Sequence, residues 1–251
     1  MKLLKALCLA LVICLSGLAA HAEELTVSAA ASLTDAFTDI EAAFEAAHPD
    51  VDVIMNFASS GALYRQIEQG APVDVYASAN PKWMDKAETN EFMVPGTRQN
   101  FVTNSLVLIT PTDNPAQVAT VNDLLEERVT RVSLGTPDTV PAGQYAKTSL
   151  ESLSLYETLE PKYIFAENVR QVLDYVLRGE VDAAFVYRTD AIQAGDEALI
   201  IETMPLDEPP TYPIAVMKTA ANAEMSQAFV DFVLGPDGQA MLQARGFSPA
   251  Q

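Results

Sequence analysis

The chain has 251 residues, of which 49% are hydrophobic, so it can bury a sizeable core and is neither disordered nor fibrous. Its 15 Lys and Arg face 34 Asp and Glu, which gives a formal net charge of −19. A surface of that sign repels phosphate backbones and anionic membranes over roughly 8 Å, the Debye length at physiological salt. We therefore expect no nucleic-acid partner. At about 150 residues per domain, the length indicates one large domain or two small ones.

Residues 1–22 differ in character from the rest of the chain. Lys2 and Lys5 precede an apolar run from Ala6 to Leu15, and the segment ends in small residues at Ala20 and Ala22. This pattern predicts a secretory signal peptide that is cleaved near Ala22, with the mature protein in the periplasm. The apolar run is too short for an ordinary membrane span, so we expect no membrane insertion after cleavage. A retained anchor is the alternative.

The predicted mature chain is poor in residues for covalent or metal chemistry. Cys8 and Cys14 both lie in the signal peptide, and Ile13 does not fit the small residue expected before a lipid-modified cysteine, so we reject a lipoprotein. Thiol enzymes and thiolate metal sites are thereby excluded. His48 is the one histidine left, and it stands before Pro49 at the end of a predicted helix, where a cation suits the helix dipole.

Short β-rich runs alternate with amphipathic helical stretches along nearly the whole mature length, which predicts an α/β fold with mixed, mostly parallel sheets flanked by helices. Strands are expected at Leu25–Ala29, Val51–Phe57, Val73–Ala77, Ser105–Thr110, Arg131–Leu134, Tyr163–Ala166, Ala183–Tyr187 and Ile214–Met217. Helices are expected at about 33–47, 169–177, 223–234 and 236–245, from apolar residues spaced three and four apart.

Two stretches look like joints between lobes. Residues 96–104 are polar, and the stretch from Pro205 to Pro213 carries four prolines. Two crossings at these places predict a clamshell in which residues 23–102 and about 215–251 form one lobe and residues about 103–214 form the other. One continuous doubly wound sheet is the simpler alternative.

Ligands of open α/β sheets bind at the carboxyl ends of strands, where the next helix offers unpaired backbone N–H groups. Ser32 follows the first expected strand, and Ser59 and Ser60 follow the second. Taken singly, each is read as a capping serine. Together they indicate a site, because both junctions lie at the same edge of the sheet.

The second half of the chain supplies comparable strand ends. Pro141 stands where a helix begins, and the small residues Ala142 and Gly143 after it would let a ligand approach the backbone. Asn168 can cap the helix that starts near Val169. Tyr187 ends a strand with an aromatic hydroxyl, which by itself reads as a half-buried strand residue.

A set of short motifs in the same order resembles the periplasmic molybdate-binding proteins of ABC importers, over about residues 25–247. The motifs are AAASL at 29–33, FASS at 57–60 with RQI at 65–67, GAPVD at 70–74, KWMD at 82–85, NSLV at 104–107, VPAGQYA at 140–146, NVRQ at 168–171 and VYRTDA at 186–191.

The resemblance implies a type II periplasmic-binding-protein clamshell that holds a tetrahedral oxyanion between its lobes. It carries the ligand-binding role over to Ser32, Ser60, Ala142, Val169 and Tyr187, with Ser59 as a possible one-residue shift. The family often has another hydroxyl residue where this chain has Gly61, so one hydrogen bond could be missing, although the N–H of Gly61 remains.

The function implied is capture of molybdate, and of tungstate, for delivery to the membrane permease subunits of an ABC importer. We expect a monomer that is not an enzyme, with no catalytic residues, no cofactor and no metal except molybdenum within the oxyanion. A sulfate-type or other oxyanion receptor of the same fold is the first alternative. An exported serine hydrolase using Ser32 or Ser60 is the remote one, since the chain has no G-x-S-x-G elbow and no well-placed histidine.

Overall fold

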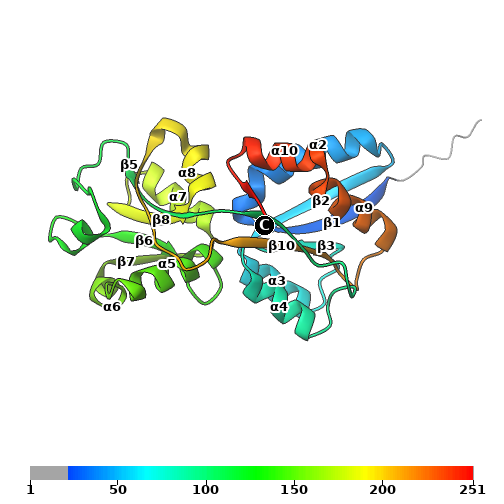
Figure 1. The fold of residues 1–251 in the computed structure, drawn as a ribbon, viewed down its shortest axis with the longest axis horizontal. Coiled ribbons are helices and arrows are strands. Elements are labelled where there is room, and N and C mark those ends of the chain that lie inside the picture. Colours follow the sequence, from blue (N-terminus) through cyan, green and yellow to red (C-terminus); the bar gives the residue numbers. More distant parts are fainter. Residues whose placement is uncertain (1–21, 251) are drawn as a thin grey trace, which may run out of the picture.

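The computed structural model describes residues 22–250. The signal peptide expected over residues 1–22 therefore lies, except for Ala22, outside the described residues. Figure 1 shows two lobes side by side along the long axis of the molecule, each built around its own sheet. In the described part of the chain, no helix combines the length and the apolar character needed to cross a bilayer.

The first lobe is built on a six-stranded sheet with the order β11-β4-β10-β3-β1-β2. Its strands are β1 (Glu23–Ala30), β2 (Val51–Ala58), β3 (Val75–Ala77), β4 (Gln99–Thr103), β10 (Thr211–Val216) and β11 (Ser248–Pro249). Helices α2 (Thr34–Ala47), α9 (Ala223–Leu234) and α10 (Pro236–Ala244) pack together on one face, while α3 (Ser60–Glu68) and α4 (Pro81–Thr89) pack on the other.

The second lobe is built on a five-stranded sheet with the order β7-β6-β8-β5-β9. Its strands are β5 (Leu106–Pro111), β6 (Val132–Gly135), β7 (Tyr163–Ala166), β8 (Ala183–Tyr187) and β9 (Ala198–Thr203). Helices α7 (Val169–Leu177) and α8 (Arg188–Ala194) cover one face, and α5 (Pro141–Ser152) and α6 (Tyr156–Leu159) the other. Short 3₁₀ turns complete the fold: η1 (Ala31–Leu33), η2 (Val121–Leu125), η3 (Glu160–Lys162) and η4 (Gly195–Glu197).

Both sheets are mixed, but parallel pairing does not dominate them as the sequence pattern led us to expect. Strand β1 pairs in parallel with β2 and β3, whereas β10 pairs antiparallel with β3 and β4. In the second sheet β6 pairs in parallel with β7 and β8, and β5 pairs antiparallel with β8 and β9. The antiparallel pairs arise where the chain crosses between lobes and enters each sheet against its neighbours.

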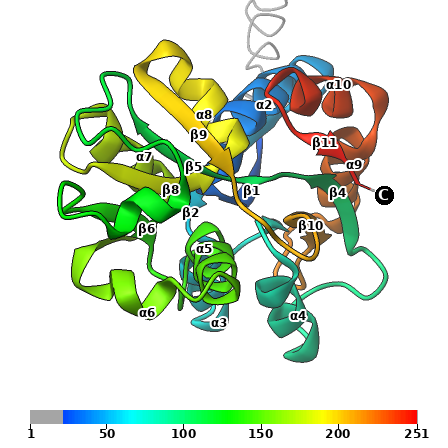
Figure 2. The same ribbon diagram turned by 60° about the vertical axis from the view of Figure 1, so that its left-hand side comes forward.

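The two crossing segments lie next to each other (Figure 2). One runs from β4 into β5 and the other from β9 into β10, and the N–H of Asn104 in the first donates to the carbonyl of Pro210 in the second at 2.9 Å. The polar stretch expected as a joint contains β4, a strand of the first sheet. Strand β10 starts at Thr211, earlier than the expected Ile214, so Tyr212 and Pro213 belong to the first sheet. A register shift beside Pro213 lets the strand accept a residue without an N–H.

Candidate functional site

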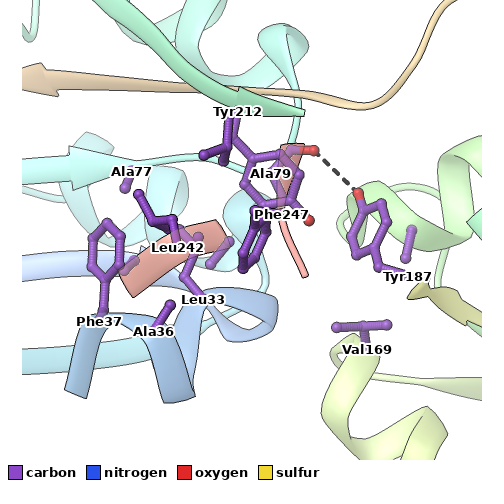
Figure 3. Packing of buried hydrophobic residues seen from close by; sticks show 14 of the residues in the cluster. Leu33, Ala36, Phe37, Ala77, Ala79, Val169, Tyr187, Tyr212, Leu242 and Phe247 are labelled. Atoms are coloured by element: carbon purple, nitrogen blue, oxygen red, sulfur yellow. Dashed lines mark hydrogen bonds between the residues drawn. The ribbon is translucent and has the colours of Figure 1, made fainter. Parts of the chain in front are cut away.

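The carboxyl ends of the parallel strands in both sheets meet at a small cavity between the lobes. The volume of this cavity is about 10 Å³. The lining residues are Ala30, Ala31, Ser32, Ser59, Ser60 and Ala79 from the first lobe and Val140, Pro141, Ala142, Val169 and Tyr187 from the second. The structure thus brings together Ser32, Ser60, Ala142, Val169 and Tyr187, and Ser59 as well. In Figure 3, Val169 and Tyr187 face Ala79, Leu33 and Tyr212 across this region.

Neither serine side chain caps a helix, contrary to the simplest interpretation of the sequence. Ser32 lies in the turn η1, and its Oγ is 3.0 Å from the hydroxyl of Tyr212. Ser60 is the first residue of α3, whose N-cap is Ser59, and that cap makes no side-chain hydrogen bond. The Oγ of Ser60 instead accepts from the N–H of Ala79 at 3.0 Å. The proton of the Ser60 hydroxyl is therefore free to point into the cavity.

Two helix N-termini from the second lobe reach the same cavity. Helix α5 begins with Pro141, so the N–H of Ala142 lies in the first turn, where no intrahelical acceptor exists. Val169 is the first residue of α7, behind Asn168, whose side chain accepts from the N–H of Gln171 as expected of a cap. Both amides, together with the helix dipoles, provide partial positive charge without a formal cation.

Gly143 was expected to let a ligand approach the backbone, but its small size serves the packing of the second lobe instead. A Cβ at this position would lie 1.8 Å from the carbonyl oxygen of Gly135, at the end of β6. Helix α5 can therefore pack this closely against β6 only because residue 143 has no side chain. Gly143 does not line the cavity.

Tyr187 closes the cavity from the second lobe. Its side chain is fully buried, and its hydroxyl donates to the carbonyl of Ala79 in the first lobe at 3.1 Å (Figure 3). A bound anion could receive this proton only after rotation about the C–O bond, which moves no heavy atom. Burial, together with the nearby Tyr212 and Tyr145, raises the pKa of Tyr187 well above 10, so the hydroxyl keeps its proton at neutral pH.

Gly61 does not offer the N–H that we expected from the sequence. That N–H donates across the cleft to the carbonyl of Thr139 at 2.9 Å, and Gly61 does not line the cavity. A Cβ at Gly61 would lie 2.6 Å from both Thr139 O and Trp83 Cζ2. The glycine therefore serves the contact between the lobes.

The lobes also touch through polar side chains around the cavity. The amide of Asn80 donates to the Oε1 of Gln144 at 2.8 Å, and Arg170 on α7 forms an ion pair with Asp35 on α2. Arg170 also contacts Asp190, at 2.7 Å from its Nε. Burial raises the pKa of Asp190 to about 6, although the guanidinium of Arg170 favours the charged carboxylate. The cleft is thus closed, and Arg170, which bridges the two lobes, already pairs with two carboxylates.

The cavity is lined by neutral residues. His48 caps the far end of α2 and packs on the ring of Phe44, with 4.4 Å between ring centroids, so it cannot act as a base for Ser32 or Ser60. Within residues 22–250, no group of three or more His, Cys, Asp or Glu side chains could hold a metal ion. The arrangement can present hydroxyl and amide donors to a small anion.

Three further residues at the site, Ala79, Tyr212 and Asn104, were not expected from the sequence. Ala79 lies between β3 and α4, in a strand-to-helix junction like those that carry Ser32 and Ser60. This similarity was the signal in the sequence that could have revealed it. Tyr212 and Asn104, which lie behind Ser32, come from the crossing segments. No local pattern marks these two, because only the pairing of the crossings brings them to the site.

Comparison with known proteins agrees with this geometry. Residues 25–248 match the family model described as bacterial extracellular solute-binding protein. The chain is 39% identical to the molybdate-binding protein ModA of Escherichia coli over 233 residues, 90% of this chain and 89% of that protein. It is 35% identical to the substrate-binding domain of a putative molybdenum ABC transporter from Clostridium difficile, with a TM-score of 0.69, covering 91% of this chain and 99% of that one.

The periplasmic molybdate-binding protein of Azotobacter vinelandii is 24% identical, with a TM-score of 0.79 and coverage of 90% of this chain and 100% of that one, and it supports the fold alone. The clamshell architecture is confirmed, as is the resemblance that the motifs indicated. The chain belongs to the family of bacterial extracellular solute-binding proteins.

Proposed function

We propose that this chain binds molybdate, and also tungstate, in the cavity between its lobes and delivers it to the permease subunits of an ABC importer. The ligand contacts are the hydroxyls of Ser32, Ser60 and Tyr187 and the backbone N–H groups of Ala142 and Val169. Support comes from the likeness to ModA and from the neutral, donor-rich lining of the cavity.

The observation that carries the proposal is that the hydroxyl oxygens of Ser32 and Ser60 each already have a hydrogen-bond partner in the protein. The Oγ of Ser60 accepts from Ala79, and the Oγ of Ser32 is paired with Tyr212. A tetrahedral anion with oxygens that only accept suits such a site. Protonated phosphate carries an O–H donor that would lack an acceptor, at a cost of about 1–3 kcal/mol.

A protein rich in negative charge can bind an anion in this way because the donors are fixed and desolvated. Helix N-termini and hydroxyl dipoles act at hydrogen-bond distance, whereas the acidic surface acts through water and salt. Sulfate is smaller than molybdate and would stretch the same donors, so we propose that cavity size separates the two.

The remaining parts of the proposal concern the cell. The protein is exported to the periplasm through a signal peptide cleaved near Ala22, acts there as a monomer, and catalyses no reaction.

Two lobes close on the ligand. One consists of residues 23–102 with the C-terminal segment, and the other of residues about 103–214. The second crossing enters the sheet of the first lobe at Thr211, a few residues before the expected boundary.

Titration calorimetry of the mature protein with molybdate, tungstate, sulfate and phosphate tests the proposal. We expect tight, comparable binding of molybdate and tungstate, weaker binding of sulfate, and the weakest binding of phosphate. Sulfate binding more tightly than molybdate would favour the sulfate-type receptor instead. A parallel ester-hydrolysis assay addresses the hydrolase alternative, for which we expect no turnover.

A further inference from the structure

A buried chain of hydrogen bonds leads from the two crossing segments to Ser32. The hydroxyl of Tyr212, on β10, lies 3.0 Å from the Oγ of Ser32. The Nδ2 of Asn104, just after β4, lies 3.3 Å from the same hydroxyl and 3.0 Å from the Oγ1 of Thr189, on α8. All four side chains are at least nine-tenths buried, with 7% exposure at Asn104 the largest. Water therefore does not compete for these contacts.

The direction of this chain follows from the backbone at one end. The N–H of Ser105 donates to the Oδ1 of Asn104 at 2.9 Å, so the Nδ2 of that amide faces Tyr212 and donates. The Tyr212 hydroxyl has one proton. Since it accepts from Asn104, that proton is available for donation to the Oγ of Ser32. When Tyr212 donates in this way, the Ser32 hydroxyl directs its own proton away from Tyr212.

We propose that Tyr212, oriented by Asn104, is a positioning residue that fixes the Ser32 hydroxyl as a hydrogen-bond donor to the bound anion. This inference rests on the proposed function, because Ser32 must contact the ligand. Through Tyr212 and Asn104, the crossing segments then take part in anion recognition. The Ser32 hydroxyl, which can either donate or accept, is held as a donor.

Two features keep Tyr212 in this role. Its ring is held by edge-on contacts with Phe101 and Phe247, at centroid distances of 6.3 and 5.5 Å. Burial raises the pKa of Tyr212 well above 10, so the proton that the chain requires is present throughout the neutral range. Figure 3 shows Tyr212 lying beside Phe247, close to Ala79 and opposite Tyr187.

The test begins with Tyr212→Phe, which keeps the ring and removes the hydroxyl. The wild type is first titrated with molybdate, tungstate, sulfate and phosphate, and the anion bound most tightly becomes the probe. We expect Tyr212→Phe to weaken probe binding by about 3- to 10-fold, as for loss of one ordinary hydrogen bond. Tyr163→Phe is the matched control, because Tyr163 is also buried and donates to a backbone carbonyl in the second lobe. This control should bind as the wild type does.

The same substitution made in a Ser32→Ala background separates positioning from a loss of structure. If Tyr212 acts through Ser32, Tyr212→Phe should change affinity by less than about 2-fold once the serine hydroxyl is absent. The full loss persisting in the Ser32→Ala background would overturn the proposal. So would unchanged affinity in Tyr212→Phe or in Ser32→Ala. Failure of the wild type to bind any of the four anions would overturn this proposal and the proposed function together, whereas binding with no coupling overturns this one alone.

Asn104→Asp gives an independent measurement if Tyr212→Phe does not fold. An aspartate can still accept from Ser105 N–H, but it also accepts from Tyr212, whose hydroxyl would then accept from Ser32. The Ser32 proton would be drawn away from the cavity, and probe affinity should fall. When Asn104→Asp is made in the Ser32→Ala background, only the effect of the added charge on affinity remains. Equal losses of affinity with and without the Ser32 hydroxyl would contradict the proposed chain of hydrogen bonds from Asn104 through Tyr212 to Ser32.

Discussion

Among single residues, Ser60 carries the most direct prediction. Its hydroxyl accepts from Ala79 N–H and lines the cavity, so its proton is available to an anion. We expect Ser60→Ala to reduce molybdate binding by about 1.5–3 kcal/mol, the range for hydrogen bonds to charged groups. Titration calorimetry measures the loss, and thermal unfolding reports separately the effect of leaving Ala79 N–H without its acceptor.

Ser59→Ala is the matched control, because Ser59 also lines the cavity while its side chain makes no cap hydrogen bond. Its affinity should stay near that of the wild type. A large loss at Ser59 with none at Ser60 would transfer the side-chain contact to Ser59.

Substitutions at Val169 test whether its backbone N–H donates a hydrogen bond to the bound anion. Proline is well tolerated at the first position of a helix, and Asn168 already has the extended conformation, φ −155° and ψ 170°, that a following proline requires. Val169→Pro therefore removes the N–H with little change to α7, and we expect a loss of molybdate affinity of about 10-fold or more. Val169→Ala keeps the N–H and should have little effect. Equal losses in the two variants would indicate side-chain packing instead.

Asp190 makes stability depend on pH. Its pKa is about 6 in the fold against 3.8 in the unfolded chain, so the native state holds this proton more tightly. The contribution of Asp190 to stability is therefore greatest below about pH 4 and declines as the pH rises through 6, by about 2–3 kcal/mol. Asp190→Asn should remove this dependence. Urea unfolding of both proteins at pH 4 and pH 7 measures it, and a difference between them that stays constant with pH would contradict the assignment.

At the scale of elements, the start of helix α3 controls how closely the lobes approach. A methyl group at Gly61 would meet Thr139 O and Trp83 Cζ2 at 2.6 Å, so Gly61→Ala should hinder the closed contact. Alanine also favours a helix by up to about 1 kcal/mol over glycine. The contact with Trp83 lies within the first lobe and opposes that gain, so we expect weaker molybdate binding with little net change in stability, measured by calorimetry and urea unfolding. Reduced stability with unchanged affinity would show that Gly61 matters for folding alone.

The sequence predicted many elements well and others poorly, for physical reasons. Strands β7 and β8 and helices α7 and α9 have the predicted bounds, because apolar periodicity and caps such as Asn168 are local signals. Strands β4 and β9 were not predicted. The first residues of β4 are exposed and polar, so this strand lacks a continuous apolar run. Strand β9 does contain one, over residues 198–201, but it is short, and Leu199 and Ile200 are exposed at the edge of the sheet, so the run does not show the alternation of a half-buried strand.

At the scale of the whole molecule, the closed cleft predicts a ligand-dependent change of shape. Contacts between the lobes, such as Gly61 with Thr139 and Asn80 with Gln144, surround the cavity, and a ligand enters only when they separate. A ligand that bridges both lobes favours the closed state. Small-angle scattering should show a smaller radius of gyration with molybdate than without it. Identical profiles, with binding verified by calorimetry, would count against hinge closure.

The sequence by itself determined the α/β class, the two crossings and the strand-to-helix junctions that supply Ser32, Ser60, Ala142 and Val169. These features depend on local chemistry: apolar period, small residues and helix-start residues placed after strands. The motifs then indicated the family to which the chain belongs.

Only the tertiary structure decided what each of these groups is paired with. It assigned the Ser60 lone pair to Ala79, the Gly61 N–H to Thr139 and the Tyr187 hydroxyl to Ala79 across the cleft. Ser32 and Tyr212 are 180 residues apart in the chain, and they meet because the second crossing returns beside the first. A hydroxyl donates or accepts according to its neighbours in space, and those neighbours are set by strand pairing and lobe closure rather than by any local pattern.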